Sequence, residues 1–397
     1  MPLNFKSNVS VRKLVLKAWL CYLRENPHDH VLYKLKMREL EALSSASGYK
    51  VVGSTLQTRS KPHPAYLIGS GKVEELRKQV GELGVQVVIF YNILSSKQHY
   101  NLTKKLMCKV IDRYDLTLEI FEQNSTDELS KLQIALARVL KEIPRVKLLA
   151  SLYYRSGREH PGPMSLGEYS YHRTLANLMK KRSSLETEVE RRRSAKILQL
   201  GKRRSLGFPS VCIAGYYNAG KTSLFNALTG LGKPVGPRPF TTLSSKYFLI
   251  PRNGTKFFLV DTIGFVVDLD PRLIASFSLT LDDLRYSDLV LFSVDISDPE
   301  DLMLLRVNTC LEFIRGLGIG NDRLIVVLNK SDLIRDAGEL SRKSELVSRV
   351  IRDAPQIVVS AKSGYNLYEL VELIERRLSA LSLTDLSTKT PVEQGPS

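Results

Sequence analysis

The sequence predicts an α/β fold in three parts: a small α/β domain, an antiparallel helical hairpin arm, and a larger α/β domain with a doubly wound sheet. Strand-like and helix-like patterns alternate over residues 11–120 and again over 210–381, which is typical of largely parallel sheets. Between them, apolar residues recur at the spacing of amphipathic helices. We expect four segments: the first domain over 1–120, the arm over 121–205, the second domain over 206–381 and a disordered tail over 382–397.

The bulk composition favours a globular, basic protein with a polyanionic partner. The 397 residues suffice for two or three domains, and 43% apolar residues can fill a core. The formal net charge of +17 favours nucleic acid as that partner, although a role of the charge in solubility alone stays open. No apolar run is long enough to cross a bilayer, so we expect no membrane partner.

The cysteines and the N-terminal residues bear on the compartment. Four cysteines stand far apart without a Cys-x-x-Cys pair, namely Cys21, Cys108, Cys212 and Cys310. They indicate neither a zinc site nor a disulfide framework, which fits a reducing compartment, and we expect a cytoplasmic protein. The residues up to Arg24 are basic and lack acidic side chains, as in a transit peptide. Residues 13–23 also have the pattern of an opening strand, which is the interpretation that we favour.

The first domain is expected to alternate strands and helices. We place strands over 13–23, 49–52, 85–90 and 109–112, and helices over 33–44, 72–83 and 95–106. Within it, Gly69-Ser70-Gly71-Lys72 looks like a fragment of a phosphate-binding loop, but the leading glycine is absent. We interpret it as a tight turn between strand and helix, and contact with an anion or an RNA phosphate is the alternative.

The arm is predicted from two runs of apolar residues at three- and four-residue spacing: Leu129, Leu132, Leu136, Val139 and Ile143, and then Leu175, Leu178, Leu185 and Val189. Its tip lies around residues 160–167, where Pro and Gly oppose helix formation. Basic side chains and tyrosines gather there, and together they suit RNA phosphates and unpaired bases. The candidate RNA-binding residues are Lys147, Arg155, Arg158, His160 and Arg173. A solvated hairpin with charged faces is the alternative. A second basic cluster over 191–204 ends the arm at a flexible joint.

The second domain opens with a strand, a glycine loop, Lys-Thr and a helix, which is the layout of a phosphate-binding P-loop. Gly215 and Gly220 allow the backbone N–H groups to point at an anion, and the helix N-terminus adds its dipole. Lys221 supplies a positive charge for the outer phosphates, and the Thr222 hydroxyl suits Mg²⁺. The nucleotide-binding residues here are Gly215, Tyr216, Tyr217, Asn218, Ala219, Gly220, Lys221, Thr222 and Ser223.

Two further segments are expected to contact the γ-phosphate and Mg²⁺. Asp261-Thr262-Ile263-Gly264 follows a buried strand, so that Asp261 can hold Mg²⁺ and the Gly264 N–H can meet the γ-phosphate. Phe240-Thr241-Thr242 lies between the P-loop helix and the next strand. We interpret it as a switch in which Thr242, rather than Thr241, closes on Mg²⁺, and a surface turn is the alternative.

The last motifs select the base. Asn329-Lys330-Ser331-Asp332 follows the strand over 324–328, and Ser360-Ala361-Lys362 follows the strand over 357–359. The Asp332 carboxylate can accept two hydrogen bonds from the N1–H and N2 amino groups of guanine, which adenine lacks. The predicted base pocket comprises Asn329, Lys330, Asp332, Ser360, Ala361 and Lys362. The motifs together predict a Ras-like P-loop GTPase domain that binds GTP and GDP, closed by a helix over 366–378.

Two positions refine the expected chemistry. Phe265 stands where many signalling GTPases have a water-orienting Gln, so we expect slow intrinsic hydrolysis or help from another group. Asn218 occupies the middle of the P-loop, as in GTPases that use a monovalent cation, and either K⁺ stimulation or stabilisation of the loop explains it. We assign catalysis to Lys221, Thr242, Gly264 and Asn218, and Mg²⁺ ligation to Thr222, Thr242 and Asp261.

With these motifs in place, the chain resembles the HflX family of ribosome-associated, translation-factor-like GTPases over about residues 30–380. The likeness is carried by residues 66–76, 110–113, 131–137, 215–223, 240–243 and 261–265. It implies binding to the large ribosomal subunit, GTP hydrolysis stimulated by ribosomes, and splitting of stalled or idle ribosomes. It also implies that the arm loop over 160–171 approaches the peptidyl-transferase region. Here Pro161-Gly162-Pro163 is followed by Met164-Ser165-Leu166-Gly167, unlike bacterial members, so the chain looks like an archaeal-type or divergent member.

We therefore expect a monomeric GTPase that uses Mg²⁺ and binds rRNA of the large subunit, coupling GTP hydrolysis to ribosome binding, splitting or recycling. A ribosome-assembly or RNA-remodelling GTPase is one alternative. A regulatory GTPase switch with a protein partner is the other.

Overall fold

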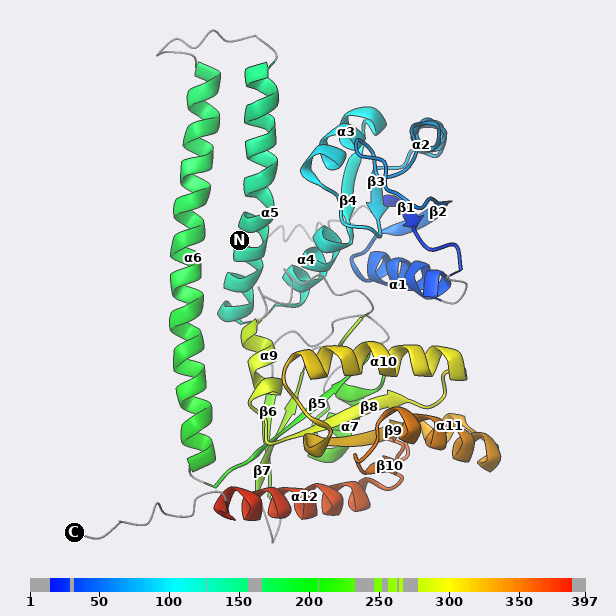
Figure 1. Cartoon of the computed structure of the whole chain (residues 1–397), viewed down its shortest axis with the longest axis vertical. Coiled ribbons are helices and arrows are strands. Elements are labelled where there is room, and N and C mark those ends of the chain that lie inside the picture. Colours follow the sequence, from blue (N-terminus) through cyan, green and yellow to red (C-terminus); the bar gives the residue numbers. More distant parts are fainter. Residues whose placement is uncertain are drawn as a thin grey trace, which may run out of the picture. The chain divides into compact units, whose positions relative to one another are not determined.

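The computed structural model of the chain describes residues 15–28, 32–125, 127–155, 166–205, 207–232, 246–251, 256–262, 264–266 and 278–387 (Figure 1). They belong to two compact units, and each is described by itself. The first unit comprises residues 1–28 and 40–116, and the second comprises residues 29–39 and 117–397.

The first unit contains a four-stranded parallel sheet in the order β2-β1-β3-β4. Its elements are β1 (Lys17–Arg24), β2 (Lys50–Thr58), α2 (Ser70–Leu83), β3 (Val87–Phe90), α3 (Ser96–Leu106) and β4 (Lys109–Asp112), and α1 (Leu32–Ala46) begins in the second unit. The predicted parallel sheet is confirmed, and the opening segment is a strand. β1 is buried at all but its first residue, which is why it carries no charged side chain between Ala18 and Leu23.

Close packing of β1 on β2 requires a glycine. A Cβ added to Gly53 would lie 2.2 Å from the Trp19 ring. The Trp19 indole is buried and donates a hydrogen bond to Thr55 Oγ1 at 2.8 Å, so the polar edge of this core residue is satisfied.

The Gly69–Lys72 segment, predicted as a tight turn between strand and helix, instead begins α2: only Gly69 precedes the helix, and Ser70, Gly71 and Lys72 lie in its first turn. Gly69 is the N-cap of α2, and its N–H donates to Gln57 Oε1 at 2.8 Å. Lys72 lies in the first turn of the helix and pairs with Glu75 at 2.5 Å.

Helix α4 (Arg113–Asn124) begins in the first unit and lies mostly in the second, which continues into the hairpin arm, formed by α5 (Glu128–Arg155) and α6 (Leu166–Ser205). The two long helices lie side by side (Figure 1), and Arg192 near the end of α6 pairs with Glu128 at the start of α5, so the helices are antiparallel. The predicted hairpin is confirmed. α6 starts at Leu166, inside the predicted tip, because a glycine such as Gly167 weakens a first helical turn without preventing it.

The remaining elements form a six-stranded sheet in the order β10-β9-β8-β5-β7-β6. The strands are β5 (Ser210–Gly215), β6 (Lys246–Ile250), β7 (Phe257–Asp261), β8 (Leu289–Asp295), β9 (Leu324–Asn329) and β10 (Gln356–Val358). Only β6, which the sequence patterns do not predict, runs antiparallel to its neighbour among these strands. The doubly wound P-loop fold is otherwise as predicted.

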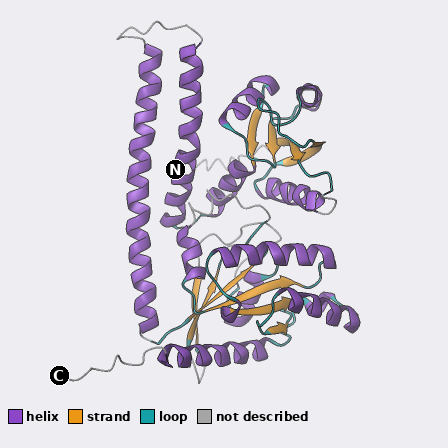
Figure 2. Cartoon of the chain, in the orientation of Figure 1, coloured by secondary structure: helices purple, strands orange, loops and turns teal. Residues whose placement is uncertain are grey.

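Helices cover both faces of this sheet, with α10 and α12 on opposite sides (Figure 2). The helices are α7 (Lys221–Thr229), α9 (Ser278–Arg285), α10 (Glu300–Gly316), α11 (Ala337–Val350) and α12 (Leu367–Ser387). β5 shows why: Val211 and Ile213 pack into the core on the α12 side, while Cys212 and Ala214 pack on the α10 side. A strand buried on both faces is therefore apolar at successive positions.

α12 extends past the predicted end of the domain at Leu381 and into the predicted tail. The reason is local, because no Pro or Gly occurs between Leu378 and Ser387 and the first proline is Pro391. Residues 388–397 lie outside the described residues. Among the described residues, no helix combines the length and apolarity needed to cross a membrane.

Candidate functional site

The P-loop connects the end of β5 to the start of α7, and its two glycines are required by both conformation and space. Gly215 has φ 144° and Gly220 has φ 83°. A Cβ at Gly215 would lie 2.3 Å from the Ser293 carbonyl oxygen, and one at Gly220 would lie 2.3 Å from Asn329 Nδ2. Asn218 also has a positive φ, of 61°, and is exposed. Because Asn tolerates this region better than most residues, the loop conformation itself explains part of its presence.

Lys221 opens α7 with a buried amine. Its Nζ donates to the Tyr216 carbonyl oxygen at 2.7 Å. Burial lowers the pKa of Lys221 to about 8, although the nearby Asp261 carboxylate favours the charged form. A Cβ at Gly264 would lie 2.8 Å from Lys221 Nζ. The P-loop amine and the Gly264 backbone therefore lie close together, as a shared γ-phosphate site requires.

The structure also brings together two of the three predicted Mg²⁺ ligands. Asp261 ends β7 and is fully buried, and the Thr222 hydroxyl donates to Asp261 Oδ2 at 3.3 Å. A hydroxyl and a carboxylate are the hard oxygen donors that Mg²⁺ prefers, and nucleotide sites complete its shell with phosphates and water. The donor set thus fits Mg²⁺. The third predicted ligand, Thr242, lies outside the described residues, together with Phe240, Thr241 and Ile263.

The segment that follows Asp261 runs beside the P-loop. The Thr262 hydroxyl donates to the Ile213 carbonyl oxygen at 2.7 Å, and the Phe265 carbonyl oxygen accepts from the Tyr217 N–H at 2.8 Å. The Phe265 side chain is 3% exposed and packs on Phe313 with ring centroids 4.5 Å apart. Phe265 is therefore a core residue that anchors this segment, and its side chain does not reach into the nucleotide site.

Asn329 connects the phosphate end of the site to the base end. It is 1% exposed at the end of β9. Its Nδ2 donates to the Ala219 carbonyl oxygen at 3.1 Å, and its Oδ1 accepts from the Ala361 N–H at 3.1 Å. The Asn329 side-chain amide thus holds the P-loop and the segment after β10 in a fixed position relative to each other.

The other predicted base-pocket residues gather around this amide. Asp332 is exposed and accepts a hydrogen bond from the Ser360 hydroxyl at 2.7 Å, which orients the carboxylate. Lys330 has φ 66°, and its Nζ pairs with Asp295 Oδ2 at 2.5 Å. Lys362 is exposed in the turn after Ser360. The Asp332 carboxylate, the Asn329 amide and the Lys330 side chain therefore lie together at the carboxyl edge of the sheet. A doubly wound fold binds its ligands at this edge.

Sequence reasoning missed two residues of β8 that support the site. The Ser293 hydroxyl donates to the Ala219 carbonyl oxygen at 2.8 Å, beside Asn329, and Asp295 holds Lys330. The available signal was that β8 turns polar at its carboxyl end. Arg306 of α10 lies over the ring of the P-loop residue Tyr216, with its Cζ atom 4.7 Å from the ring centroid. It also forms an ion pair with Asp298.

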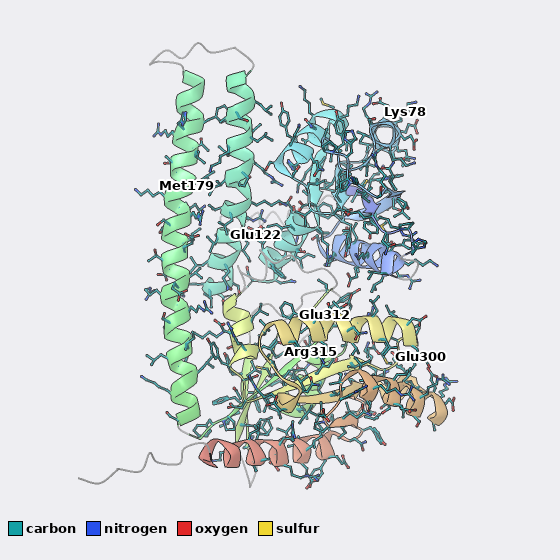
Figure 3. All side chains as sticks on the ribbon, in the orientation of Figure 1. Lys78, Glu122, Met179, Glu300, Glu312 and Arg315 are labelled. Carbon is teal, nitrogen blue, oxygen red and sulfur yellow. The ribbon has the colours of Figure 1, made fainter. Side chains whose placement is uncertain are left out.

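The candidate RNA-binding residues fall on the arm. Lys147 of α5 and Arg173 of α6 are exposed, whereas Arg158 and His160 lie outside the described residues, as does the side chain of Arg155. Most described side chains of α6 are exposed, Met179 among them (Figure 3). In the second basic cluster, however, Arg193 and Lys196 form ion pairs with α9.

Two family models match the chain. Residues 34–122 match a family described as GTP-binding GTPase N-terminal. Residues 210–330 match a family described as 50S ribosome-binding GTPase.

Curated relatives match along most of their length. A GTPase HflX of Hyperthermus butylicus is 32% identical over 348 residues, covering 86% of this chain and 92% of that protein. One from Thermococcus kodakarensis is 36% identical, covering 86% of this chain and 78% of that protein. Among solved structures, a complex of SsGBP with GDP is 27% identical with a TM-score of 0.51, covering 94% of this chain and 100% of that one.

Proposed function

The chain belongs to the HflX family and is a GTPase, and on that premise we propose that it binds the large ribosomal subunit and couples GTP hydrolysis to ribosome binding, splitting or recycling. The match to a 50S ribosome-binding GTPase family supports the partner. The net charge of +17 supports a nucleic-acid surface on that partner.

The phosphate end of the site supplies charge and fixed donors. We propose that the Lys221 amine and the Gly264 N–H bind the γ-phosphate, since these groups already lie together. Thr222 and Asp261 would hold Mg²⁺, joined by Thr242. When bound, Mg²⁺ neutralises charge that develops on the phosphates. Positioning and charge stabilisation of this kind supply most of the catalysis in phosphoryl transfer.

The base end would select guanine. The Asp332 carboxylate is held by Ser360, and Asn329 holds the surrounding backbone in place. A carboxylate fixed in this way can accept hydrogen bonds from the two N–H donors of guanine. With adenine bound, it would lose both of these hydrogen bonds.

Ribosome docking is proposed to complete the catalytic site. Phe265 is part of the core, so it cannot orient the attacking water, and the exposed Asn218 is the P-loop side chain that we propose for K⁺ assistance. We propose that hydrolysis is slow in the free protein and accelerates when the arm binds rRNA through Lys147, Arg173 and the basic residues near the tip. The protein would act as a monomer on ribosomes of the cytoplasm.

The observation that carries this proposal is the joining, in one chain, of a guanine-nucleotide site to a basic helical arm. The test is sedimentation with purified large subunits through a sucrose gradient, in GDP and in a non-hydrolysable GTP analogue. We expect co-sedimentation with the analogue and little with GDP, together with faster GTP turnover when subunits are added. Absence of both effects would refute the proposal. Binding to immature subunits, with intact ribosomes left unsplit, would favour an assembly role instead.

A further inference from the structure

Two adjacent acidic residues of α9 are buried and paired with the arm. Asp282 is 2% exposed and Asp283 is 3% exposed. Arg193 of α6 contacts Asp282 with two nitrogens, Nε to Oδ2 at 2.9 Å and Nη2 to Oδ1 at 3.3 Å, and Lys196 Nζ lies 2.6 Å from Asp283 Oδ2. Buried carboxylates are costly unless they are paired, so these two ion pairs fix where α6 meets α9.

Asp283 also contacts the nucleotide-binding sheet. The Tyr247 hydroxyl of β6 donates to Asp283 Oδ1, and the Asp283 carbonyl oxygen accepts from Cys212 Sγ of β5 at 3.1 Å. One residue therefore connects the arm to β6 and to the strand that leads into the P-loop. We call the set of Arg193, Lys196, Tyr247, Asp282 and Asp283 the arm joint.

The two described elements that the arm joint connects to α6 each follow one of the predicted γ-phosphate segments along the chain. β6 begins at Lys246, a few residues after Thr242, and α9 begins at Ser278, downstream of Gly264. When nucleotide state changes either segment, the change can reach β6 or α9, the next described element along the chain, and the joint holds that element against α6. This placement is what a mechanical connection between nucleotide and arm requires.

A cavity beside the arm joint gives the helix room to move. Its volume is about 150 Å³, and it is bounded by Ile197 and Leu200 of α6, by Tyr247 of β6 and Phe258 of β7, and by Tyr286 after α9. Close-packed interfaces resist sliding, whereas one that borders a pocket can repack between two arrangements. The ion pairs then act as the tether while the apolar contacts rearrange.

We propose that the arm joint transmits nucleotide state to the arm, with Arg193 and Asp282 as positioning residues that act through β6 and α9. This inference rests on the proposed ribosomal function for its biological role, but the mechanical link can be measured without ribosomes. Arg193 and Lys196 are thus assigned to coupling within the chain, although they belong to a basic cluster that the sequence places beside an RNA-binding arm.

The first test is a charge swap. Arg193→Glu and Asp282→Arg should each leave GDP affinity and basal GTP turnover within about twofold of wild type, as for residues outside the nucleotide site. Each should reduce stimulation by large subunits at least about fivefold, the lower end of typical coupling between sites. The double variant, which restores opposite charges, should recover most of the stimulation.

The matched control is Arg191→Glu. Arg191 is exposed on the same helix and pairs with Glu188 of that helix, so this variant makes the same charge change without touching α9. If Arg191→Glu and Arg193→Glu lost equal amounts of stimulation by large subunits, the proposed role of the arm joint would be overturned. The loss would then reflect a general electrostatic effect. Failure of the double variant to recover would also overturn the proposed role. If a charge variant does not fold, Tyr247→Phe removes a single hydroxyl and should reduce stimulation in the same direction.

The second test needs no ribosome. Pulsed EPR between spin labels at Met179 of α6 and Glu312 of α10 reports the distance between the arm and the GTPase domain. The labelled protein also carries Cys108→Ser, because Cys108 is partly exposed. We expect the distance distribution to change between GDP and a non-hydrolysable GTP analogue, and Arg193→Glu to abolish that change. An unchanged distribution in the wild type would overturn the joint, even if subunits stimulated GTP turnover.

Discussion

Replacing Asn329 should damage both ends of the nucleotide site at once. The buried amide makes three hydrogen bonds at 2.8–3.1 Å, to the Ala219 carbonyl oxygen and from the N–H groups of Lys330 and Ala361. Each such bond contributes about 1 kcal/mol net, and buried partners left unpaired add to the loss. The bond to Lys330 is between neighbours and we discount it. Asn329→Ala should therefore reduce the free energy of unfolding by about 2–3 kcal/mol.

A second variant separates the two ends. Asn329→Asp keeps the oxygen that accepts from Ala361, but it places a carboxylate oxygen against the Ala219 carbonyl oxygen instead of an N–H donor. It should weaken the P-loop and lower affinity for GTP, while the segment after β10 keeps its contact.

The measurements are denaturant unfolding and titration with fluorescent GDP and GTP analogues. The control is Asn321→Ala, because Asn321 is another asparagine that donates to a backbone carbonyl, that of Arg352, at an exposed site. It should change the free energy of unfolding by less than about 0.5 kcal/mol. If Asn329→Ala behaved like this control and bound nucleotide normally, the amide would not connect the two ends of the site.

Three further outcomes follow from the same geometry. Asp332→Asn should shift base preference from guanine towards xanthosine nucleotides, measured by competition binding, and an unchanged preference would remove Asp332 from the base pocket. Burial lowers the pKa of Lys221 to about 8 from an ordinary 10.5. Between pH 8 and pH 10.5 the unfolded chain therefore binds more protons than the folded one, so the nucleotide-free protein gains stability as the pH rises through this range. Because bound phosphates favour the charged amine, which is about half protonated near pH 8 in the free protein, GTP binding there should take up at most about half a proton. Calorimetry in buffers of different ionisation enthalpy would show this uptake, and buffer-independent heats would contradict it. Lys147→Glu with Arg173→Glu should weaken binding to large subunits and flatten its salt dependence while GDP affinity stays unchanged; an undiminished salt slope would exclude an electrostatic contact there.

The sequence alone could point to the candidate nucleotide site because the motifs of this site are local. Gly215 to Thr222 encodes a loop conformation and its ligand within one short run, and Asp332 follows a strand whose apolar pattern is unmistakable. What could not be predicted depends on distant pairs. Asp295 holds Lys330, and Arg193 holds Asp282 across 89 residues. No pattern along the chain distinguishes this paired, partly buried arginine from its more exposed neighbour Arg191.

The sequence also could not show in which direction a side chain points. The motif shows that Phe265 replaces a common Gln, but the ring contact with Phe313 shows that the side chain faces the core. β6 escaped prediction because its single antiparallel pairing is set by β7 and not by the alternation of strand and helix.

The order of strands in the first unit has a consequence for synthesis of the protein. β1 is made first, yet it lies in the middle of the sheet, between β2 and β3. A nascent chain that ends before Val87 exposes one edge of a highly apolar strand, and such edges are templates for aggregation. Chaperone capture during translation should therefore persist until β3 has left the exit tunnel, and truncated fragments that stop short of it should be insoluble.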